Sequence, residues 1–213
     1  IAENTQGEIN FYYDGTKVNS VTGLTFNSRM VVINTKICFF PNKTYLELIK
    51  SGSNVTIGSY GSLESTRTLS AVSLTLSNDG VTMSISTGHG FGYDDAVNIV
   101  GTLTYTPQGG SSTTKACNVS CIIEQIISGT PNDTIVLPRE TFIELTGEGA
   151  TDITITATMS RTMPNLDHVI EWNNRLWGAS NTDNTIYACK LGDPKNWQYY
   201  QGTGLDSYYA QNR

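Results

Sequence analysis

Few residues in this chain have the types and spacing that enzymes or metal sites require. His89 lies in a glycine-rich segment shortly before Asp94 and Asp95, and a histidine with two carboxylates could hold a metal ion. The chain has only 2 His, however, and the other, His168, lies far along the sequence. A histidine between glycines is more often part of a turn, so we expect no metal site and no cofactor.

Asp193 is the carboxylate with the most informative surroundings. In Gly192-Asp193-Pro194, the proline presets the backbone for a type I turn, and the aspartate can accept a backbone N–H two or three residues further on. Trp197 can then fold back over this structural turn. A glycoside hydrolase needs two carboxylates that face each other, and Asp193 alone is not such a pair. The chain also lacks the nucleophile-elbow, phosphate-loop and zinc-protease motifs, so we expect no catalytic residue.

The 4 Cys are not spaced like a disulfide framework or a zinc site. Cys117 and Cys121 would lie about 13 Å apart in an extended segment, which is too far for a disulfide. Cys38 and Cys189 each have apolar neighbours, as small core residues do. We therefore expect free thiols, which suit a reducing cytoplasm.

Large aromatic side chains gather towards the C-terminal end of the sequence. They are Trp172, Trp177, Trp197, Tyr199, Tyr200, Tyr208 and Tyr209. Such a group can stack on sugar rings, but tryptophan and tyrosine are also the main contributors to β-sheet cores and subunit interfaces. We expect a core or an interface here, with a glycan-stacking platform as the alternative.

Composition and charge argue against several classes of protein. A net charge of −6 with only 13 Lys plus Arg leaves no basic stripe, so we expect no direct binding of nucleic acid. Apolar runs such as residues 29–40 are shorter than the roughly 20 residues that span a bilayer, and we expect no membrane partner. The 20 Gly, the many Thr and Ser residues and a charged fraction of 15% indicate short strands and tight turns.

Short β-strands must therefore position these residues. Residues 30–48 are predicted to form three antiparallel strands joined by turns at 34–36 and 41–43. Residues 169–189 repeat the same order: a strand, an asparagine-centred turn with a cation, an apolar strand, a polar turn and a strand with a tyrosine. The two copies lie far apart, which indicates that another segment is inserted between them.

The middle of the chain has a different pattern. Alternating apolar and polar residues on both sides of Asn78-Asp79-Gly80 predict a hairpin. We expect further strands at residues 96–105, 116–127, 134–137, 141–145 and 153–159. This number of short strands is typical of a small barrel or sandwich, and we expect the region to fold by itself.

The predicted fold class is therefore all-β, in three segments. Residues 1–65 and 161–213 form a discontinuous antiparallel sheet like a propeller blade. Residues 66–160 form an inserted small β-barrel or sandwich domain.

Several segments resemble structural proteins of phages and prophages of Gram-positive gut bacteria. SRTMPNLD (160–167), NNRLWG (173–178), IYACKLGDPKNW (186–197) and DSY (206–208) are similar to a recurring signature of these proteins. ICFFPNK (37–43) and GSLE (61–64) resemble the blade that precedes an inserted domain in the same proteins. FGYDDAVNI (91–99) matches them only in its general residue pattern. Such proteins resemble β-propellers and include tail and DNA-stabilisation proteins.

The resemblance implies a non-enzymatic virion component of the tail or the head–tail connection, assembled in the cytoplasm of the host bacterium. Its partners would be other virion subunits or further blades of the same polypeptide. A propeller would need more blades after residue 208, so we expect a piece of a longer protein that self-associates through its aromatic group when isolated. Two alternatives stay open: a carbohydrate-binding or host-adhesion module of a phage tail, and a glycoside hydrolase subunit.

Overall fold

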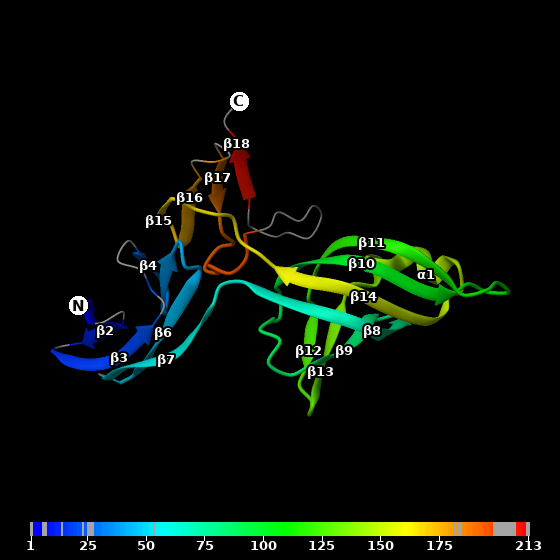
Figure 1. The fold of residues 1–213 in the computed structure, drawn as a ribbon, viewed down its shortest axis with the longest axis horizontal. Helices are drawn as coiled ribbons and strands as arrows, with labels where there is room; N and C mark the ends of the chain where they lie inside the picture. The colour runs from blue at the N-terminus through cyan, green and yellow to red at the C-terminus, as the bar shows by residue number, and fades with distance from the viewer. Residues whose placement is uncertain are drawn as a thin grey trace. The chain divides into compact units, whose positions relative to one another are not determined.

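The computed structural model divides into two compact units (Figure 1). It describes residues 2–5, 8–13, 15–22, 24, 28–52, 54–180, 182, 185–197 and 208–211. Among these residues, the first unit takes those within Ile1–Glu64, Met163–Tyr199 and Leu205–Arg213, and the second takes those within Ser65–Thr162. Nearly all regular structure is antiparallel β-sheet, which confirms the all-β prediction.

The first unit contains three separate sheets. The N-terminal sheet has the strand order β1-β2-β3, with β1 (Ala2–Thr5), β2 (Glu8–Tyr13) and β3 (Thr16–Thr22). A four-stranded sheet follows, with β4 (Arg29–Ile33), β5 (Lys36–Phe40), β6 (Thr44–Ser51) and β7 (Asn54–Ser62). The second four-stranded sheet has β15 (His168–Trp172), β16 (Arg175–Ala179), β17 (Thr185–Ala188) and β18 (Tyr208–Gln211). In each sheet every strand pairs with the next strand of the chain.

In both four-stranded sheets, the turn between the first two strands contains asparagine in a left-handed conformation. Asn34, between β4 and β5, has a φ of 51°, while Asn173 and Asn174, between β15 and β16, have φ values of 53° and 57°. Asparagine tolerates this left-handed conformation better than most residues, and two such residues in succession form a type I′ hairpin turn. The first residues of the two sheets, Arg29 and His168, are 139 positions apart and share a hydrogen bond.

Strand β5 is buried on both of its faces. Phe39 packs against Phe11 of the N-terminal sheet, with ring centroids 5.7 Å apart. Cys38 and Phe40 point to the other face and belong to a core that β15 and β16 complete. This core contains Ile33, Cys38, Phe40, Leu63, Met163, Leu166, Val169, Leu176, Cys189 and Trp197. Burial on both faces explains why this strand is a continuous apolar run rather than an alternating one.

The second unit is a single open sheet, so the predicted barrel is wrong. Its seven strands follow the order β11-β10-β14-β8-β9-β13-β12, and β11 and β12 are its two edges. The strands are β8 (Ser65–Ser77), β9 (Gly80–Ser86), β10 (Ala96–Thr106), β11 (Thr113–Ile122), β12 (Gln125–Ile127), β13 (Asn132–Leu137) and β14 (Thr151–Arg161). A barrel would need the two edges to pair with each other.

The long strand β8 lets this open sheet enclose a core. Its first part pairs with β14 and its last part, from Leu74 to Ser77, pairs with β9 (Figure 1). At residues 69–72, within the part that pairs with β14, the register shifts and Ala71 takes a φ of 51°, which is the geometry of a bulge that bends a strand. Side chains from both halves, such as Met83 of β9 and Ile155 of β14, therefore meet in one hydrophobic cluster.

Residues 141–145 are helical, so the strand predicted there is also wrong. A 3₁₀ turn, η1 (Arg139–Phe142), follows Pro138 and leads into the short helix α1 (Ile143–Gly147). Phe142 and Leu145, three positions apart, lie on the buried side of this turn, while Ile143 and Glu144 are exposed. A spacing of three to four residues between buried positions is helical, whereas an alternating strand would bury every second residue.

Candidate functional site

The structure separates the aromatic group that the sequence singled out. Trp172 and Trp177 lie together, with ring centroids 6.2 Å apart, and the indole N–H of Trp177 donates to the carbonyl of Trp172 at 3.2 Å. Trp197 is 3% exposed and belongs to the core between the two four-stranded sheets. Tyr208 and Tyr209 contribute their backbone to β18, and their side chains are not described. Tyr199 and Tyr200 lie outside the described residues.

Gly192, Asp193 and Pro194 form a closed turn in which the backbone N–H and both carboxylate oxygens of Asp193 have partners. The backbone N–H of Asp193 donates to the carbonyl of Lys190 at 3.0 Å. Its carboxylate accepts the backbone N–H of Lys195 at 3.0 Å and the side-chain amide of Asn196. Trp197 closes the turn by donating its indole N–H to the carbonyl of Pro194 at 2.7 Å. All of these bonds are within the turn, which is the arrangement of a structural element.

The same turn ties the two asparagine hairpins together. The backbone N–H of Gly192 donates to the carbonyl of Asn174 at 2.7 Å. The carbonyl of Gly192 accepts the side-chain amide of Asn34 at 2.9 Å. Gly192 has a φ of 72°, and a side chain there would meet both asparagine side chains at 3.2 Å, so glycine suits the position. Sequence reasoning found the turn but not its partners, because they are distant in the chain.

One face of the β15–β17 strands is apolar and exposed. We call it the outer face, formed by Ile170, Trp172, Trp177, Ala179 and Ile186. Strand pairing places Ile170 opposite Trp177 and Ala179 opposite Ile186, so these side chains share one side of the sheet. Ile170 is 63% exposed, Trp172 64% and Ile186 51%. A shallow hollow of about 210 Å³ lies on this face, lined by His168, Ile170, Trp177, Gly178, Ala179 and Ile186.

The polar groups near the outer face are already engaged. His168 Nδ1 is 3.0 Å from the guanidinium of Arg29. Arg175 donates from Nη1 to the carbonyl of Cys189 at 2.8 Å. The indole N–H of Trp177 is bonded to the carbonyl of Trp172. The face therefore offers apolar area and few hydrogen-bond donors, which suits a protein surface better than a sugar.

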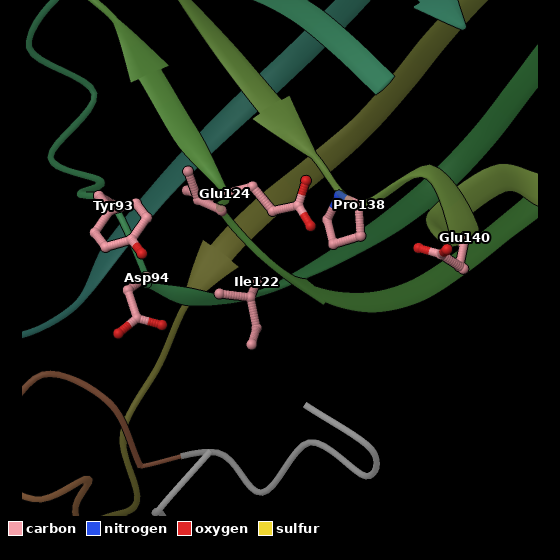
Figure 2. A pocket seen from close by; sticks show the side chains of 7 residues that line it. Tyr93, Asp94, Ile122, Glu124, Pro138 and Glu140 are labelled. Atoms are coloured by element: carbon pink, nitrogen blue, oxygen red, sulfur yellow. The ribbon is translucent and has the colours of Figure 1, made fainter. Parts of the chain in front are cut away.

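A second hollow, of about 400 Å³, lies on the second unit. Figure 2 shows the side chains around it, which include Tyr93 and the carboxylates of Asp94, Glu124 and Glu140. Tyr93 is 74% exposed. Only Tyr93 and Asp94, which lie in a glycine-rich segment, could have pointed to this site from the sequence, because Glu124 and Glu140 come from distant connections. Its acidic lining would favour cationic groups.

His89, Asp94 and Asp95, the candidate metal ligands, do not form a ligand set. His89 is buried, accepts the backbone N–H of Phe91 on Nδ1 at 3.0 Å, and has Nε2 3.2 Å from a carboxylate oxygen of Asp133. Asp95 instead forms a buried ion pair with Arg161. Among the described residues, no three His, Cys, Asp or Glu side chains are arranged to hold a metal ion.

All four cysteines are free thiols and are buried. Desolvation raises the pKa of Cys38 and of Cys121 to about 12 and that of Cys189 to about 11, and it also raises the pKa of Cys117. The thiolate is the reactive form, and a raised pKa makes it scarce at neutral and mildly alkaline pH. No disulfide joins these residues.

We expect a maleimide at pH 8 to leave all four thiols of the folded chain unlabelled. Over the same time, the denatured chain should be labelled completely. Mass spectrometry after a short labelling pulse measures this directly. Rapid labelling of any one cysteine in the folded chain would contradict its burial.

The described part of the chain contains no helix that is long and apolar enough to cross a membrane. Comparisons of the chain with protein-family models, with curated proteins and with solved structures find no match.

Proposed function

We propose that this chain is a non-enzymatic structural protein of a phage or prophage virion, from the tail or the head–tail connection, assembled in the cytoplasm of the host bacterium. The observation that carries the proposal is the outer face of β15–β17. Contiguous exposed apolar surface on a sheet is uncommon in proteins without partners and usually marks an interaction site. The virion setting rests on the resemblance of segments such as residues 173–178 and 186–197 to phage structural proteins.

We further propose that the two four-stranded sheets are propeller-like blades and that residues 65–162 are a domain inserted between them. Each sheet is a meander in strand order, and each opens with an asparagine turn. The sheets pack face to face through the core that contains Phe40 and Leu176. Repeated sheets that stack in this way bury a core that a single sheet cannot.

Carbohydrate binding is the second candidate. Trp172 is exposed beside Trp177, and exposed tryptophan rings are the side chains on which sugars stack. The engaged polar groups around them favour a protein partner instead. A glycan array would separate the two functions: binding that Trp172→Ala abolishes would favour the adhesion module.

Quantitative mass spectrometry of purified particles of the encoding phage tests the proposed function. We expect the chain in the particles at a constant ratio to the major capsid protein. Particles of normal composition and infectivity that lack the chain would contradict a structural role.

A further inference from the structure

The glycine-rich segment 87–95 of the second unit is held to the sheet through its backbone. Three successive carbonyls, those of Gly88, His89 and Gly90, accept hydrogen bonds from side chains of β8 and β14. The donors are the side chains of Ser65, Arg67 and Arg161. One side of the segment is therefore fixed by the two strands beneath it.

The side chain of His89 holds the next part of the segment. It is 5% exposed, and its Nδ1 accepts the backbone N–H of Phe91 at 3.0 Å. A ring nitrogen that accepts a hydrogen bond carries no proton, so the single proton of the neutral ring is on Nε2. Nε2 lies 3.2 Å from a carboxylate oxygen of Asp133 on β13. The closed segment therefore contains a neutral His89.

A second proton on His89 is incompatible with this arrangement. It would bind at Nδ1 and place one N–H against the N–H of Phe91. The hydrogen bond would be lost, and two donors would be left buried without an acceptor, which is costly. An imidazolium at this position therefore requires the segment to open.

Charged groups approach this segment from three strands. Asp133 of β13 lies beside Nε2 and favours an imidazolium, but it already faces the N–H of the neutral ring. Arg67 of β8 and Arg161 of β14 bind the carbonyls on either side of His89, and their positive charges disfavour an imidazolium. Asp95, within the segment, is paired with Arg161. The charges therefore oppose one another, and the bond at Nδ1 sets the direction.

The same segment leads into the acidic hollow of the second unit. Tyr93 and Asp94, which line this hollow of about 400 Å³, follow shortly after Phe91 (Figure 2). The backbone N–H of Asp94 donates to the carbonyl of Ile123, another lining residue, at 2.8 Å. A change at Phe91 is therefore transmitted along the backbone to the hollow.

We propose that His89 is a proton-sensitive latch, which releases Phe91 when it takes up a proton and so opens residues 87–95 and the acidic hollow. Histidine in an open chain takes up a proton below about pH 6.5. In acid the open segment therefore binds one proton more than the closed segment, and the closed form loses stability as the pH falls. Opening becomes about tenfold easier for each pH unit below that value. The latch lies in the second unit and does not depend on the outer face.

Amide hydrogen exchange of the full chain, followed by NMR, tests the latch. Dividing each exchange rate by that of an unstructured chain at the same pH gives a protection factor without the intrinsic pH dependence. We expect the protection of the Phe91 amide to fall about tenfold from about pH 7.5 to about pH 5.5, while amides of the central strand β10 change less than about twofold. NMR of the imidazole nitrogens at neutral pH should show His89 protonated on Nε2 alone.

His89→Asn is the matched variant, because asparagine can accept the N–H of Phe91 through Oδ1 but takes up no proton in this range. It should remove the tenfold change, whereas His168→Asn, at the other of the 2 His, should keep it. Asp133→Asn should also keep it, because Nδ1 is unchanged.

Three results would overturn the latch. The first is a Phe91 protection that stays constant or rises towards about pH 5.5 in the unchanged chain, a result that does not depend on the folding of any variant. The second is a tenfold fall that persists in His89→Asn. The third is loss of the pH dependence in Asp133→Asn, which would assign the effect to that carboxylate.

Discussion

Replacing Trp197 by alanine is expected to lower the free energy of unfolding of the first unit by about 3–5 kcal/mol, the range for large core truncations. Trp197 is 3% exposed in the core between the two four-stranded sheets. Its loss also removes the bond to the carbonyl of Pro194 that closes the turn. Denaturant unfolding followed by the fluorescence of Trp172 and Trp177 measures the change.

Asp193→Asn is the matched control for this prediction. Asparagine keeps one oxygen acceptor for the backbone N–H of Lys195 but cannot accept both of the bonds that the carboxylate accepts. We expect a loss of about 0.5–1.5 kcal/mol, the net contribution of one hydrogen bond. Losses of similar size for Asp193→Asn and Trp197→Ala would contradict the assignment of Trp197 as the core residue and Asp193 as a turn residue.

The second large effect is expected from Asp95→Ala in the second unit. Asp95 and Arg161 form an ion pair in which both side chains are almost fully buried, and Asp95 also accepts the backbone N–H of Gly92 at 2.7 Å. Removing one partner of a buried pair leaves a charge without compensation, which typically costs about 3–5 kcal/mol. We expect the second unit to open far more often than in the unchanged chain.

The rate at which the cysteines are labelled reports the opening of each unit separately. Cys117 and Cys121 lie in the second unit, and Cys38 and Cys189 lie in the first. Pulsed maleimide labelling of Asp95→Ala should therefore become faster at Cys117 and Cys121 only. Lys115→Ala, which breaks an exposed ion pair with Glu144 in the same unit, should change the labelling little. Equal labelling rates in Asp95→Ala and Lys115→Ala would contradict a structural role for the buried pair.

Local features of this fold could be predicted from the sequence. The hairpin of β8 and β9 follows from alternation around Asn78-Asp79-Gly80, and the asparagine turns follow from the conformations that asparagine tolerates. In each case the relevant interactions lie within a few residues of one another. The all-β character followed from the same local signals.

Long-range features could not be predicted in this way. Whether the seven-stranded sheet closes depends on where β11 and β12 lie relative to each other, and no local pattern specifies that. The partner of Asp95 is 66 positions away, at Arg161. The exposure of Ile170 and Trp172 depends on which face of β15 meets the β4–β7 sheet, and the adjacent apolar residues Val169 and Ile170 do not distinguish the two faces.

Under the proposed function, this chain acts as a virion component through the outer face of β15–β17. The most direct test of this proposal is to introduce Ile170→Lys into the proposed encoding phage and count infectious particles, with Ile143→Lys, the same change at an exposed residue of the second unit, as the control. The proposal predicts that Ile170→Lys gives folded protein at a normal level but few complete particles, while Ile143→Lys assembles normally. Normal yields of infectious particles from Ile170→Lys, with the variant chain built into them, would contradict it.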